Sequence, residues 1–140
     1  MIKNVFFTLM AVILFSCGNN GEVGINAGFD HDSDMGTAQI TFSEYEHDFG
    51  KIYEGEQVSC FFKYTNTGTA DLIVASASAS CGCTVPKYDV KPIRPGDSGT
   101  MEVRFDSSGR NGVQTKTITV KSNAGSPVVM LKISADVITN

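Results

Sequence analysis

The sequence contains no tryptophan, only two histidines and few basic residues. These low counts limit the classes of function that the protein could have. Lysine and arginine together number 11 against 15 aspartates and glutamates, which gives a formal net charge of −4 at pH 7. Proteins that bind nucleic acid rely on clustered Lys and Arg to contact phosphates. Because the basic residues here are scattered along the chain, we expect no nucleic-acid partner.

Signatures of catalysis and of cofactor binding are also missing. The sequence has no Gly-x-Ser-x-Gly, no phosphate-binding loop and no His-Glu-x-x-His segment. His31 lies in a polar N-terminal segment, and His47 stands between two acidic residues, where a solvated imidazole is expected more often than a catalytic base. No spacing singles out a pair of carboxylates for acid–base chemistry. We therefore expect a protein without a cofactor that is not an enzyme.

Long apolar runs are absent except at the N-terminus. After Lys3, the run from Val5 to Phe15 is almost unbroken, but a bilayer span needs roughly 20 apolar residues. Its length is typical of the apolar part of a secretory signal. The run ends in Leu14-Phe15-Ser16-Cys17, which resembles the lipidation site of a bacterial lipoprotein signal. This pattern predicts a signal peptide at residues 1–16 and a lipid on Cys17, with a plain signal peptide or an uncleaved anchor as alternatives.

Cleavage before Cys17 would leave 140 − 16 = 124 residues, enough for one domain. Its charge would be 10 − 15 = −5, because Lys3 is lost. Bacterial lipoproteins of this kind carry two or three acyl chains, such as palmitate, and two chains are enough for stable anchoring. The expected partner is therefore a membrane, contacted through the N-terminal lipid. The expected location is the cell envelope, on the periplasmic or the surface face of the outer membrane.

The segment 18–38 is rich in Gly, Asn and Asp and has no apolar periodicity, so it is predicted to be a flexible tether. Asp30, Asp32 and Asp34 alternate within it as in a calcium-binding loop. Met35 and Thr41, however, occupy the positions at which that loop needs glycine and glutamate. The domain proper is predicted over residues 39–140.

Period-two alternation predicts strands throughout residues 39–140. The clearest strand is Gln57 to Thr65, in which Val58, Cys60, Phe62 and Tyr64 share one face; Phe61 interrupts the polar opposite face. No stretch shows helical apolar spacing over three turns. Short strands separated by regular turn signals, over about 100 residues, favour an all-β, immunoglobulin-like β-sandwich of about seven strands.

With Cys17 lipidated, three cysteines remain, and they include the only candidate reactive site. In an extended strand the side chains of Cys81 and Cys83 would project from one face. Three interpretations stay open: a weak disulfide across one glycine, a soft-metal (Cu or Zn) site to which Cys60 could contribute, or small residues packing at a strand end before Pro86. Cys60 alternates with core residues and is expected to act as a buried hydrophobe.

One set of motifs runs through the predicted domain: Phe49-Gly50, Glu54-Gly55-Glu56, Phe62, Asn66-Thr67-Gly68, Asp71-Leu72-Ile73-Val74, Ser80-Cys81-Gly82-Cys83-Thr84-Val85-Pro86, Ile93, Pro95-Gly96, Val103-Arg104-Phe105-Asp106, Gly109 and Gly112. This set resembles a domain-of-unknown-function family of bacterial lipoproteins and secreted proteins. That family is related to hydin and abnormal-spindle immunoglobulin-like domains and, more distantly, to pilus chaperones. The resemblance implies a seven-stranded sandwich with a binding or scaffolding role, and no established reaction or ligand.

These observations together predict a lipid-anchored, non-enzymatic binding or scaffolding module of the cell envelope. Its partner would be an envelope protein or a glycan, recognised through an edge strand or through the loops at 66–70 and 107–112. The alternative is a thiol-redox or Cu/Zn-binding protein that acts through Cys81 and Cys83. A spacer without a partner is the third interpretation.

Overall fold

The structure is a computed structural model that describes residues 36–139 as an all-β domain. The predicted signal peptide, Cys17, His31 and most of the predicted tether lie outside the described residues. No helix within residues 36–139 is long and apolar enough to cross a membrane. The eight strands are β1 (Ile40–Phe42), β2 (Glu46–Tyr53), β3 (Gln57–Asn66), β4 (Val74–Ala79), β5 (Thr84–Tyr88), β6 (Ser98–Asp106), β7 (Gly112–Ser122) and β8 (Val128–Ile138).

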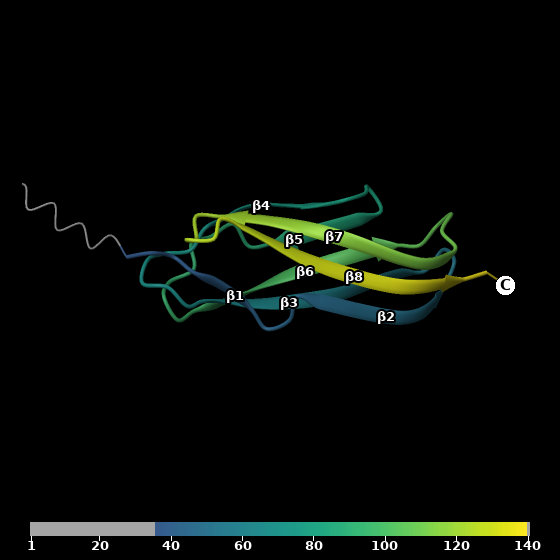
Figure 1. Cartoon of the computed structure of the whole chain (residues 1–140), viewed down its shortest axis with the longest axis horizontal. Helices are drawn as coiled ribbons and strands as arrows, with labels where there is room; N and C mark the ends of the chain where they lie inside the picture. Colours follow the sequence, from purple (N-terminus) through teal and green to yellow (C-terminus); the bar gives the residue numbers. More distant parts are fainter. Residues whose placement is uncertain (1–35, 140) are drawn as a thin grey trace, which may run out of the picture. The chain divides into compact units, whose positions relative to one another are not determined.

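The strands form two four-stranded sheets that pack face to face (Figure 1). Sheet I has the order β1-β3-β6-β5, and sheet II has the order β2-β8-β7-β4. All neighbouring strands are antiparallel except β2 and β8, which are parallel. This arrangement confirms the predicted immunoglobulin-like sandwich.

The structure has eight strands where about seven were expected, and the additional strand is β5. One of the three interpretations of Cys81 and Cys83 placed a strand end before Pro86, but β5 continues through Pro86 to Tyr88. Proline lacks an N–H, so it is confined to strands with a free edge. β5 is the last strand of sheet I and tolerates proline for this reason.

The core lies between the two sheets and is built by the alternation seen in the sequence. In β3 the residues Cys60, Phe62 and Tyr64 are buried, whereas their neighbours Ser59 and Phe61 are exposed. The same pattern holds in β6, β7 and β8. The buried side chains of these three strands are Met101, Val103, Phe105, Ile118, Val120, Leu131, Ile133, Ala135 and Val137.

The end of the predicted tether packs against the domain. Ala38 is only 3% exposed and belongs to the core cluster. The amide of Thr37 donates to Oγ1 of Thr69 at 3.1 Å, and the amide of Thr69 donates to the carbonyl of Thr37 at 2.9 Å. A Cβ on Gly68 would lie 2.1 Å from the Thr37 carbonyl oxygen. Residues 36–38 therefore form part of the folded domain.

One buried asparagine organises this end of the sandwich. Asn66 is fully buried, and its Nδ2 donates to the carbonyls of Ala70 and Ile93, at 2.8 Å each. Its Oδ1 accepts from the amides of Gln39 (3.3 Å) and Gly68 (3.0 Å). These four hydrogen bonds join three chain segments, so Asn66 acts as a structural residue.

A buried serine has the same role at the opposite end. Ser107 is fully buried, and its hydroxyl lies 2.9 Å from the carbonyl of Tyr53 and 2.8 Å from that of Glu56. The amide of Gly109 donates to Oε1 of Glu54 at 2.7 Å. The loop that follows β6 is thereby tied to the turn between β2 and β3.

Candidate functional site

The structure places Cys81 and Cys83 in the connection between β4 and β5, where the chain passes from sheet II to sheet I. A disulfide joins them, with 5.3 Å between their Cα atoms. The sequence suggested an extended segment at this point, but residues 81–83 form a turn instead. The turn brings the two sulfurs together, so their meeting does not depend on a shared strand face.

Hydrogen bonds to both sheets fix this turn. The amide of Ser80 donates to the Thr117 carbonyl in sheet II, and the amide of Asp106 in sheet I donates to the Cys83 carbonyl, at 2.9 Å each. Thr84 is buried beneath the disulfide, with its hydroxyl 3.8 Å from Sγ of Cys81. Both cysteines are partly exposed, and Cys83 also packs against the core.

The third cysteine stays in the core, apart from this pair. Cys60 is a buried free thiol that lies opposite Val103 in the β3–β6 ladder. Burial, together with a smaller contribution from the charge of Glu44, raises the pKa of this thiol to about 11. Within residues 36–139, no three His, Cys, Asp or Glu side chains come together in a way that could hold a metal ion.

His47 lies in β2, with its ring packed edge-on against Phe49 at a centroid distance of 4.8 Å. Its Nδ1 is 3.8 Å from Oε1 of Glu44, and the imidazole is about one-third exposed. The structure therefore places the histidine in a surface cluster of acidic and aromatic side chains.

The outer face of sheet I presents a more distinctive feature. Phe61 projects from β3 with 62% of its surface exposed. The strand register puts Phe61 opposite Glu102 of β6, and Glu102 opposite Lys87 of β5. An aromatic ring, a carboxylate and an ammonium group thus lie in a row across three strands. We call the surface made by Phe61, Lys87, Thr100 and Glu102 the Phe61 face.

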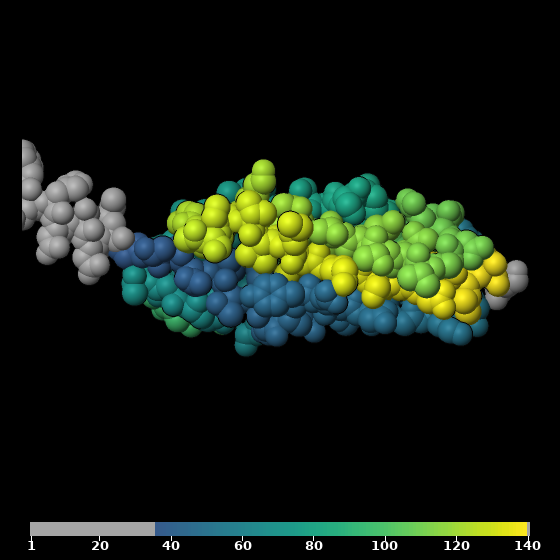
Figure 2. Space-filling view, viewed as in Figure 1, coloured from purple at the N-terminus to yellow at the C-terminus, as the bar shows by residue number. Residues whose placement is uncertain are grey.

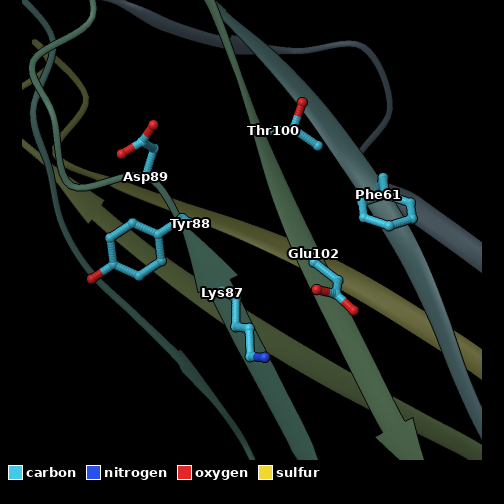
Figure 3. A pocket seen from close by; sticks show the side chains of 6 residues that line it. All are labelled: Phe61, Lys87, Tyr88, Asp89, Thr100 and Glu102. Atoms are coloured by element: carbon cyan, nitrogen blue, oxygen red, sulfur yellow. The ribbon is translucent and has the colours of Figure 1, made fainter.

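A shallow, open hollow of about 400 Å³ lies on the Phe61 face (Figure 3). Tyr88 and Asp89 complete its wall at the point where the chain leaves β5. Most of its lining side chains are polar: Lys87 offers a donor, Glu102 and Asp89 offer acceptors, and the Thr100 hydroxyl offers both. The ring of Phe61 adds an apolar surface. Arg104 lies close by, with Nη2 3.4 Å from Oε1 of Glu102.

The sequence carries one signal for this hollow. Phe61 is the single apolar residue on the otherwise polar face of its strand. The other members come together only through the pairing of β3, β6 and β5, and nothing in the sequence alone gives that strand order.

The two loops expected to bind partners carry structural residues. In the loop at 66–70, Asn66 is buried and Gly68 touches the backbone of residues 37–39. In the loop at 107–112, Ser107 is buried and Gly109 is held by Glu54. Many changes in these loops would therefore perturb folding as well as any surface contact.

A model of the protein family "Protein of unknown function (DUF1573)" matches residues 40–137. The chain belongs to this family. The resemblance seen in the sequence is thereby confirmed, and the match covers nearly all of the described domain. No curated protein matches the DUF1573 chain significantly.

Solved structures that resemble this DUF1573 domain share its fold at low sequence identity. A protein of unknown function from Porphyromonas gingivalis W83 has 20% identity and a TM-score of 0.60; the match covers 72% of this chain and 46% of that one. An ASH/PapD-like domain of human CEP192 has 10% identity and a TM-score of 0.62, covering 74% and 88%. The Vibrio cholerae VesB protease has 16% identity and a TM-score of 0.57, covering 71% and 32%. The chain thus spans less than half of the P. gingivalis protein, and these likenesses show the fold alone.

Proposed function

We propose that this DUF1573 protein is a lipid-anchored, non-enzymatic module of the cell envelope that binds a partner through its Phe61 face. The observation that carries the proposal is the exposed ring of Phe61 beside a hollow with hydrogen-bonding walls. An exposed aromatic residue surrounded by polar groups is the typical composition of an interface centre and its rim. The hollow is shallow and open, which suits contact with the surface of a macromolecule more than enclosure of a small ligand.

The envelope location depends on the N-terminal sequence. Labelled palmitate should enter the wild-type protein and should not enter Cys17→Ser, and only the wild type should fractionate with membranes. Equal incorporation into both proteins, or none into either, would contradict the lipid anchor without affecting the proposed binding face.

Partner binding is tested by co-purification from chemically crosslinked envelopes. Wild-type protein should recover one partner in stoichiometric amount, and the Phe61→Ser variant should recover much less of that partner. Met130→Ser is the matched control, because Met130 is a similarly exposed apolar residue (67%) on β8, which belongs to the other sheet. The surface of β8 is seen at the yellow end of the colour scale in Figure 2. Recovery that is equal for both variants, or absent for the wild type, would contradict the proposal.

A second candidate is thiol–disulfide exchange at Cys81 and Cys83, and the disulfide between these two partly exposed residues favours it. A disulfide that closes so short a loop gives little stabilisation, which makes its reduction by an external dithiol easier. Reduction would release two thiolates that also suit Cu(I) or Zn. A thiol count before and after mild reduction, with metal analysis of protein purified without chelator, tests this candidate. No exchangeable thiols and no bound metal would eliminate it.

A further inference from the structure

Strand β3 is paired along its whole length on one side and along only part of it on the other. β6 pairs with β3 from Gln57 to Thr65, whereas β1 pairs with it only from Tyr64 to Asn66. After β1 the chain crosses to sheet II and continues as β2, which pairs with β8 (Figure 1). Within residues 36–139, no strand pairs with β3 on this side between residues 57 and 62. We call this stretch the open edge.

The hydrogen bonds that surround the open edge show which main-chain groups it presents. The amide of Ser43 donates to the Lys63 carbonyl at 2.9 Å, so Lys63 directs its carbonyl away from β6. In an antiparallel ladder, alternate residues direct their N–H and C=O groups to the same side. Ser59 and Phe61 therefore direct their donors and acceptors outward at the open edge.

We propose that an extended segment of a partner protein pairs with the open edge and adds a fifth strand to sheet I. The proposal rests on the proposed function and names the class of partner. Donors and acceptors that alternate at strand spacing match another extended main chain, and strand addition to a free edge is an established mode of peptide recognition. A glycan lacks such a repeating pattern of paired amide donors and carbonyl acceptors.

The side chains of the open edge define what the segment should carry. A residue placed opposite Phe61 would lie about 5 Å away, where aromatic and β-branched side chains pair best. Lys63 is exposed on the same face, two residues along β3. Ser43 already lies opposite Lys63, so the segment cannot extend past this point. In an antiparallel segment, the residue two positions after the apolar one would lie opposite Ser59, where Ser or Thr is favoured.

The length of the open edge favours a short segment over a second copy of this chain. Six residues at about 3.3 Å each span roughly 20 Å. A stable interface usually engages about 20–30 residues on each partner, far more than this edge offers. The other edge of sheet I, β5, contains Pro86 and has no N–H to donate there. The open edge of β3 is therefore the better template for strand addition.

The first experiment selects peptides against the full chain in detergent. A phage-displayed library of nine-residue peptides should yield sequences with an aromatic or β-branched residue and a Ser or Thr two positions after it. Phe61→Ser should weaken their binding at least tenfold, and Met130→Ser should change it less than twofold. An unenriched library, or peptides that bind both variants equally, would overturn the proposal.

The second experiment tests the main-chain pairing, first by changes in the peptide and then by one variant of the protein. N-methylation of single amides along a selected peptide should weaken binding strongly at every second position and little at the positions between. Ser59→Pro removes an N–H that points outward and leaves the hydrogen bonds between β3 and β6 intact. This variant should weaken the binding of the same peptide. Uniform effects of N-methylation, or a dimer in sedimentation that Phe61→Ser abolishes, would overturn strand addition by a partner. Either result would leave the co-purification of an envelope partner unaffected. The proposed strand addition and the proposed partner binding can therefore be refuted separately.

Discussion

At the scale of single residues, a few buried polar groups determine how the ends of the sandwich close. Asn66 and Ser107 are both fully buried and hydrogen-bonded to main-chain atoms of distant segments. Buried polar groups without partners are costly. Asn66 gives a partner to the Ala70 carbonyl and to the Gln39 and Gly68 amides, whereas Ser107 adds a second hydrogen bond at carbonyls that already accept main-chain amides. Their roles are structural although they lie in loops, where function is usually sought.

Asn66→Ala should destabilise the domain by about 2–4 kcal/mol, because the Ala70 carbonyl and the amides of Gln39 and Gly68 lose this partner and the Ile93 carbonyl loses one of its two donors. Chemical denaturation followed by circular dichroism measures the free energy of unfolding. Asn111→Ala is the control, since Asn111 is exposed and should cost less than about 0.5 kcal/mol. Equal effects of the two substitutions would contradict the role given to Asn66.

Cys60 should make stability depend on alkaline pH. Burial, with a smaller contribution from Glu44, raises the pKa of its thiol from 9.0 to about 11 in the folded protein, so the neutral form is favoured by folding. This contribution is fully present below pH 9 and is lost as the pH rises from about 9 to 11. The free energy of unfolding should fall over that range by about 1–3 kcal/mol more in wild type than in Cys60→Ala. If the free energy of unfolding fell equally with pH in wild type and Cys60→Ala, the raised pKa of Cys60 would be contradicted.

At the scale of elements, alternation in the sequence predicted the strands well and the connections poorly. The pattern at Gln57 to Thr65 gave β3 nearly to its ends, because one face of β3 is buried and the other is solvated. The turn at Cys81–Cys83 could not be predicted, since its shape depends on hydrogen bonds to Thr117 and Asp106 in two different sheets. Local sequence carries no record of such long-range contacts.

Substitution by alanine should be costly at one glycine and nearly neutral at another that lies in a different connection. In Gly68→Ala the new Cβ would meet the Thr37 carbonyl oxygen and the Gln39 amide nitrogen, and backbone atoms cannot yield easily. We expect a loss of about 1–3 kcal/mol in the free energy of unfolding. Gly82→Ala is the matched change, because nothing lies within 4 Å of its Cβ position. Its cost should stay below about 0.5 kcal/mol, and the reverse order would refute the described packing.

The Cys81–Cys83 disulfide should contribute little to stability. The loop-entropy model gives roughly 1.6 kcal/mol for so short a loop, before any strain. Hydrogen bonds from Ser80 and Asp106 hold the turn independently of the sulfurs. Mild reduction should therefore lower the free energy of unfolding by less than about 2 kcal/mol and leave the β-type circular dichroism spectrum unchanged. Loss of that spectrum on reduction would show that the disulfide is essential for the fold.

At the scale of the whole molecule, the sequence predicted the architecture and only part of the candidate site. Because each strand buries one face, apolar and polar residues alternate along the sequence. The all-β fold could therefore be inferred from the sequence. The hollow beside Phe61 depends on the order β3-β6-β5, and the open edge depends on the crossing of the chain from β1 to β2. Both are consequences of topology, and topology is decided by packing across the whole domain.

Site-specific photo-crosslinking in living cells tests the central claim, that the Phe61 face recognises a partner, most directly. A photoreactive amino acid in place of Phe61 should give one discrete adduct of defined mass, and the same amino acid in place of Met130 on the opposite sheet should give none. Adducts that are equal at both positions, or absent at position 61, would contradict the account.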